Sequence, residues 1–86
     1  MTAKEACGIL LDEMNGYKPI SCMEYETLFV FQIVPESYKP KKEGETLLDG
    51  LFSVNKATHR VKSFKPFDLP IAEYRAGKRI TDFKVI

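Results

Sequence analysis

The first periodic pattern in the chain is helical and lies at its beginning. Apolar side chains recur at steps of three and four residues, and the stripe is made by Ala3, Cys7, Leu10, Leu11 and Met14. Thr2 and Glu5 have the spacing of a capping box, which predicts the start of the helix. Asn15-Gly16 supplies a residue that can adopt the left-handed conformation, so the helix should end there.

The next pattern alternates with a period of two, as in a β-strand. From about Cys22 to Val34 the chain is predicted to form one long strand, with apolar residues on both faces near its end. A strand of this kind is central in a sheet, and both of its faces need cover. Pro35 ends it, and residues 35–45 carry the charged, Pro- and Gly-containing composition of a mobile solvated loop.

A hairpin is predicted from residues 47–55 and 60–65, where Phe52 and Val54 alternate with polar or smaller neighbours and Val61 does the same. The turn between the two strands is residues 55–59, in which Asn and Thr side chains can bond their own backbone.

After the hairpin, residues 66–70 contain two prolines and break the strand. Asp68 is predicted to cap a short helix with Pro70 in its first turn, running through Tyr74 to Gly77. The spacing of Ile80 and Phe83 then fits either a closing strand or a docked tail, and the pattern leaves this open.

Together these elements predict an α+β fold in a single domain, residues 1–86. An N-terminal helix packs on an antiparallel β-meander of three to four strands, and a short C-terminal helix lies on the same face of the sheet. The core is expected where Phe29, Phe31 and Ile33 meet the first helix.

Composition supports a small globular domain and restricts its compartment. Of the 86 residues, 44% are hydrophobic, yet the longest apolar stretch is residues 28–34, too short to span a membrane. The first eight residues include Lys4 and Glu5, which do not fit a signal peptide. We therefore expect a cytoplasmic protein in which Cys7 and Cys22 are reduced, Cys7 being a helix core residue and a disulfide between them the less favoured alternative.

The residues that catalysis requires are scarce. The chain has one histidine, His59, in a predicted solvated turn, and no Gly-rich phosphate loop or nucleophile elbow. Asp12 and Glu13 point apart on the helix, whereas Glu24 and Glu26 are expected to share the solvent-facing start of the long strand. The sequence predicts no enzyme, with no catalytic residue, cofactor or metal site.

Charge is distributed unevenly along the chain. Residues 1–55 carry a net charge of −4 and residues 56–86 a net charge of +5. One interpretation is a nucleic-acid-binding face, with Phe64 and Phe67 nearby to stack on bases. Its cations would be Lys56, Arg60, Lys62 and Lys65. The other, which the near-neutral total charge favours, is a lysine-rich sheet edge that prevents aggregation.

Six phenylalanines and four tyrosines are a large apolar content for one small sheet and one long helix. An uncovered face would be buried by a protein partner or by self-association, and a homodimer is one solution. The alternative is that the C-terminal helix, around Ile71 and Tyr74, folds back over the sheet.

The segment Leu51 to Val61, with the letters LFSVNKATHRV, resembles the closing hairpin of PepSY-like and YrhB-type immunity-protein domains. Those domains place an N-terminal helix before a strand meander, and their hairpin usually has Gly where this chain has His59. The resemblance covers the order of elements over residues 3–65. It implies a small non-catalytic bacterial domain that binds a protein or peptide, and it transfers no site residue.

Overall fold

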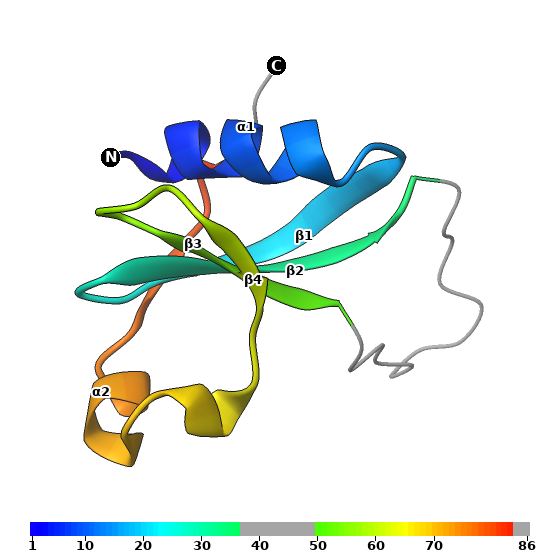
Figure 1. The fold of residues 1–86 in the computed structure, drawn as a ribbon. Helices are drawn as coiled ribbons and strands as arrows, with labels where there is room; N and C mark the ends of the chain where they lie inside the picture. Colours follow the sequence, from blue (N-terminus) through cyan, green and yellow to red (C-terminus); the bar gives the residue numbers. More distant parts are fainter. Residues whose placement is uncertain (37–49, 84–86) are drawn as a thin grey trace, which may run out of the picture.

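The computed structural model describes residues 1–36 and 50–83. Five antiparallel strands form one sheet in the order β4-β3-β2-β1-β5, with α1 on one face and α2 toward the other (Figure 1). The elements along the chain are α1 (Ala3–Glu13), β1 (Tyr17–Glu24), β2 (Leu28–Pro35), β3 (Leu51–Asn55), β4 (Val61–Ser63), the 3₁₀ turn η1 (Pro66–Asp68), α2 (Ile71–Arg75) and β5 (Lys78–Ile80). The α+β prediction is confirmed, with five strands where three to four were expected.

The first helix forms as its sequence predicts. The Glu5 backbone N–H donates to the Thr2 hydroxyl over 3.2 Å, and the Thr2 backbone N–H donates to the Glu5 carboxylate over 3.3 Å. This capping box satisfies two of the amide groups that a helix start leaves without partners. At the other end Gly16 has a φ of 87°, a conformation that glycine adopts without steric cost.

The prediction of one long strand from Cys22 to Val34 is wrong, because two strands meet there at a tight turn. The Tyr25 backbone N–H donates to the Leu28 carbonyl over 2.8 Å, which leaves Glu26 and Thr27 as the loop. Neither loop residue has a positive φ, so the turn needs no Gly or Asn, and the sequence carries no turn signal.

The first strand was missed because a β-bulge interrupts its alternation. Pro19 pairs with Ile33 and Ser21 with Gln32, so Ile20 is the extra residue and its side chain is exposed. On its other edge β1 pairs with β5 only from Cys22 to Glu24, so on that side no strand of the described residues lies beside Pro19 to accept from the N–H that proline lacks.

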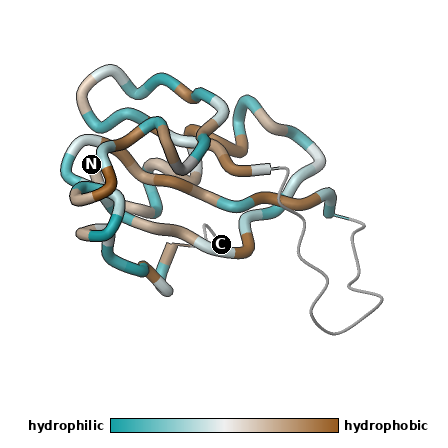
Figure 2. The backbone as a smooth tube through the Cα atoms, turned by 90° about the horizontal axis from the view of Figure 1, so that it is seen from below, coloured by the Kyte–Doolittle hydropathy of each residue, from teal (hydrophilic) through white to brown (hydrophobic). Residues whose placement is uncertain are grey.

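The main core lies between α1 and the sheet. Phe29, Phe31 and Ile33 of β2 face it, as predicted, together with Leu10. The other buried members are Ala6, Cys7, Cys22, Val54 and Phe83. Figure 2 shows hydrophobic stretches of backbone, coloured brown, running through the middle of the molecule.

The hairpin is confirmed within the described residues, as β3 and β4. The part of its predicted first strand before residue 50 lies outside them, as does the predicted loop beyond Glu36. The Asn55 side-chain carbonyl accepts from the backbone N–H groups of Ala57 and Thr58 at 2.8 and 2.9 Å. His59 follows with a φ of 60°, so it occupies a left-handed position without being glycine.

The C-terminal part differs from its prediction in two ways. Asp68 does not cap the helix: it ends η1, and Pro70 is the N-cap of α2, which stops at Arg75 rather than Gly77. The two helices also lie on opposite faces of the sheet, not on one (Figure 1).

The sequence leaves open whether the residues around Ile80 and Phe83 form a closing strand or a docked tail, and the structure contains both. Residues Lys78–Ile80 form β5, beside β1. Phe83 then returns to the core under α1, with its ring edge-on to Phe31 at 6.0 Å between centroids.

No helix in the described part of the chain is both long enough and apolar enough to cross a membrane.

Candidate functional site

The face of the sheet opposite α1 has a smaller core built from aromatic rings. Tyr25 stacks on Phe64 and on Tyr74, with centroid distances of 6.2 and 5.9 Å, and Phe64 stacks on Tyr74 at 6.5 Å. Val30 lies beneath them on β2, and Leu69 packs against the same group. Because Tyr74 belongs to α2, this stack holds the η1–α2 segment against the sheet.

Local bonds shape the η1–α2 corner, which we define as residues 65–76. The Lys65 backbone N–H donates to the Asp68 carboxylate over 2.9 Å, which fixes the first turn. The Tyr74 N–H donates to the Pro70 carbonyl at 2.9 Å, which starts α2. Gly77 follows directly, and a Cβ there would lie 2.5 Å from the Tyr25 ring, so only glycine permits this approach.

The outer side of the corner is apolar and open. Phe67 is 78% exposed and Ile71 is 72% exposed, the two highest values among the large hydrophobic residues described as exposed. The Lys65 ammonium lies 5.8 Å from the centre of the Phe67 ring. The corner therefore has one anchored side and one side that presents two large apolar groups to solvent.

A pocket of about 510 Å³ lies beside α2, at the end of the sheet where β1 turns into β2. Its charged lining mixes three glutamates with two lysines: Glu24, Glu26, Glu73, Lys56 and Lys78. Glu24 and Lys56 pair at 2.8 Å, and the Lys56 ammonium also lies 4.9 Å from the centre of the Phe29 ring. Glu24 is thus a partly buried ion-pair residue at the end of β1, not the solvent-facing start of a strand.

A second cleft, also of about 510 Å³, runs along the hairpin. It is lined by Leu28, Ser53, Asn55, Thr58, Arg60 and Lys62. The two ionisable side chains among these described lining residues are both cationic. We call it the hairpin cleft.

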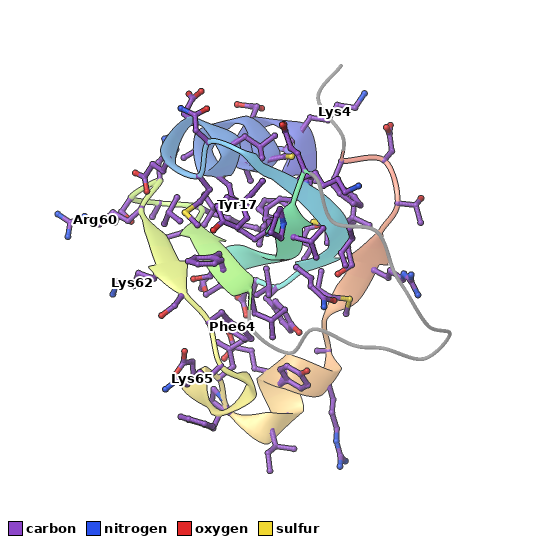
Figure 3. The ribbon with its side chains drawn as sticks, turned by 90° about the vertical axis from the view of Figure 1, so that its right-hand side faces the viewer. Lys4, Tyr17, Arg60, Lys62, Phe64 and Lys65 are labelled. Atoms are coloured by element: carbon purple, nitrogen blue, oxygen red, sulfur yellow. The ribbon has the colours of Figure 1, made fainter. Side chains whose placement is uncertain are left out.

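The four cations proposed for nucleic-acid binding do not form one stripe. Arg60 and Lys62 share the hairpin cleft, whereas Lys56 is paired with Glu24 and lines the other pocket. Lys65 lies at the η1–α2 corner over Phe67. Figure 3 shows Arg60 and Lys62 projecting from the hairpin and Lys65 farther along, near η1.

The remaining candidate residues lie either exposed on the surface or buried in the main core. His59 is exposed in the hairpin turn, and Asp12 and Glu13 are exposed on α1. Cys7 and Cys22 lie in the main core and form no disulfide, and burial, with smaller effects of Cys7 and Glu24, raises the pKa of Cys22 to about 12. Among residues 1–36 and 50–83, no group of three His, Cys, Asp or Glu side chains is arranged to hold a metal ion.

The sequence predicts other roles for Phe67 and Ile71: Phe67 would stack on the bases of a nucleic acid, and Ile71 would help cover the sheet. The structure assigns that covering to Leu69 and Tyr74 and leaves Ile71 outside. The prolines at 66 and 70 were the available signal, because they divide the segment into two short turns.

No protein-family model matches this chain, and no curated protein and no solved structure is significantly similar to it.

Proposed function

We propose that this chain is a non-catalytic module that binds another protein through the outer side of the η1–α2 corner. The observation that carries the proposal is the exposure of Phe67 and Ile71, four positions apart, on a segment whose inner side is anchored. Burying a large apolar side chain contributes about 1.5 to 3 kcal/mol, so two such groups would contribute a useful share of a binding free energy.

Preorganisation strengthens the argument. Because the stack of Tyr25, Phe64 and Tyr74 already orders the corner, a partner does not need to order it on binding. Aromatic side chains are also over-represented among the residues that dominate interface energies. The partner surface that fits is an apolar groove able to take a phenyl ring and a branched aliphatic group.

The resemblance of the Leu51 to Val61 hairpin to PepSY-like and YrhB-type immunity-protein domains points to the same function class. We also propose a cytoplasmic location, since the two cysteines lie buried in the core without a disulfide between them.

A photo-crosslinking residue at position 67 tests the proposal in the source cell. We expect one defined adduct, lost when Ile71→Ser is added and absent when the same probe replaces Lys4, an exposed residue of α1. Labelling from position 67 that does not exceed labelling from position 4, or that persists with Ile71→Ser, would contradict the proposal.

The mass of the adduct identifies the kind of partner. An adduct at twice the chain mass of 9.8 kDa means that the second copy predicted as a homodimer is the partner. Light scattering of the purified chain over a range of concentrations is the matching measurement in solution.

Nucleic-acid binding through Lys56, Arg60, Lys62 and Lys65 is the alternative. The ion pair between Lys56 and Glu24 argues against it, because one of the four cations is already neutralised. A face that tracks a nucleic-acid backbone needs several free cations in a row.

A further inference from the structure

The hairpin cleft contains positive charge that nothing in the described residues neutralises. Arg60 and Lys62 are both exposed and form no ion pair with any residue that the structure describes. No carboxylate of residues 1–36 or 50–83 lines the cleft. This separates it from the pocket beside α2, where glutamates outnumber lysines.

The register of the sheet brings the cleft residues together. Ser53 of β3 is paired with Lys62 of β4, and Asn55 is paired with Leu28 of β2, so these side chains share the face opposite α1. The Ser53 hydroxyl donates to the Lys62 carbonyl over 3.4 Å and is 8% exposed. Leu28 gives the cleft an apolar wall.

Asn55 supplies a neutral donor whose direction the turn fixes. Its side-chain oxygen already accepts from the N–H groups of Ala57 and Thr58. This orients the amide so that its Nδ2 group points away from those bonds, and no described residue accepts from Nδ2. An anion in the cleft would meet two cationic side chains, and the side-chain amide of the lining residue Asn55 offers a further N–H donor.

We propose that the hairpin cleft binds a phosphate group carried by a small organic molecule. A guanidinium offers paired N–H donors that match phosphate oxygens, and an ammonium adds a compact charge. The volume of about 510 Å³ lies within the range of small-molecule sites and exceeds the needs of a free phosphate, so the Leu28 wall has room to contact an apolar group next to the phosphate. This site is separate from the η1–α2 corner and does not depend on the protein-binding proposal.

The test is a titration of the ¹⁵N-labelled full chain with inorganic phosphate and with phenyl phosphate, followed by NMR at constant ionic strength. We expect saturable shifts of the Ser53 and Lys62 amides and of the Asn55 side-chain NH₂ group. Tighter binding of phenyl phosphate indicates an organic ester as the ligand, whereas equal binding reduces the proposal to a site for free phosphate. An absence of saturable shifts with both ligands overturns it.

Asn55→Asp is the sharpest variant, because the new carboxylate can still accept the turn N–H bonds while it replaces the donor with a negative charge. We expect it to abolish phosphate binding and to leave the fold intact, as judged from the dispersion of the NMR spectrum. Binding that survives Asn55→Asp overturns the placement of the site.

Cation variants separate a defined site from diffuse attraction. Arg60→Ala and Lys62→Ala should each weaken phosphate affinity about tenfold, since each removes a charge-assisted hydrogen bond. Lys65→Ala removes the same charge outside the cleft and should change the affinity less than about twofold. Equal losses of phosphate affinity in all three variants would overturn the proposal. A single-stranded oligonucleotide that binds with a steep salt dependence, and whose affinity all three variants lower equally, would replace it with a nucleic-acid face.

Discussion

The two faces of the sheet are built from similar amounts of aromatic side chain but serve different ends. Under α1, helix and strand residues interlock, and Phe29, Phe31 and Leu10 are almost inaccessible to solvent. On the other face, Tyr25 and Phe64 are buried, yet the helix that covers them has no fully buried residue of its own. The first face buries its large apolar side chains, whereas on the second face part of the apolar side chains is exposed to solvent.

The difference follows from element length. An eleven-residue helix can place a continuous apolar stripe on a sheet, whereas a five-residue helix has little more than one turn and can bury only one side. The η1–α2 corner therefore leaves Phe67 and Ile71 outside, while Leu69 and the ring of Tyr74 pack on the aromatic stack.

Matched phenylalanine truncations on the two faces test this contrast most directly. Phe31→Ala should lower the free energy of unfolding by about 3 to 5 kcal/mol, because it leaves a cavity among rigid neighbours. Phe64→Ala should cost less, about 2 to 3 kcal/mol, because the short η1–α2 corner can settle into the space. Urea titrations of both variants give these values, and equal costs would show that the two faces are packed alike.

The same contrast explains what sequence patterns could predict. Where the pattern was regular, the predictions were confirmed: the helical stripe of α1, the core-facing residues of β2 and the side-chain bonding in the Asn55 turn. They failed at the Ile20 bulge and at the turn of Glu26 and Thr27, since a bulge breaks the period of two and a turn without positive φ needs no special residue.

The exposed corner was harder to predict, because exposure depends on tertiary geometry. Leu69 and Ile71 are chemically similar and two positions apart, yet one packs on the aromatic stack and the other does not. Their burial is decided by where Pro66 and Pro70 break the segment, which local periodicity does not encode.

Gly77→Ala tests how tightly the second face holds the corner. The added Cβ would lie 2.5 Å from Cε1 of Tyr25, closer than carbon atoms approach, so the ring or α2 must shift. We expect a loss of about 1 to 3 kcal/mol and a changed near-ultraviolet circular dichroism signal from the tyrosines.

Ala76→Ser is the control for Gly77→Ala, because Ala76 is exposed and neighbours the same turn. It should change stability by less than about 0.5 kcal/mol. A Gly77→Ala protein as stable as the wild type would mean that the corner moves freely and that its preorganisation is absent.

The burial of Cys22 in the first face predicts a dependence of the free energy of unfolding on pH. Burial raises the pKa of Cys22 from 9.0 to about 12, so between these values the unfolded chain releases a proton that the folded protein keeps. The stabilisation is complete below pH 9 and is lost as the pH rises toward 12, at about 1.4 kcal/mol per pH unit. Urea titrations at several pH values should therefore give a shallower decline for Cys22→Ala than for the wild type, and parallel declines would contradict this account.

The smallest expected effect on stability comes from a substitution in the hairpin turn, outside both cores. Because it leaves the packing of both faces unchanged, it is a reference for the larger effects. His59 holds a φ of 60°, where the Cβ of a non-glycine residue meets steric resistance. His59→Gly removes that Cβ, and the gain is reduced by the greater freedom of glycine in the unfolded chain, so we expect a net stabilisation of about 0.5 to 1 kcal/mol. His59→Ala keeps the Cβ and should bring no gain, which makes it the matched control in thermal unfolding. Equal melting temperatures for the two variants would mean that the turn carries no such strain, and that its geometry suits histidine as well as glycine.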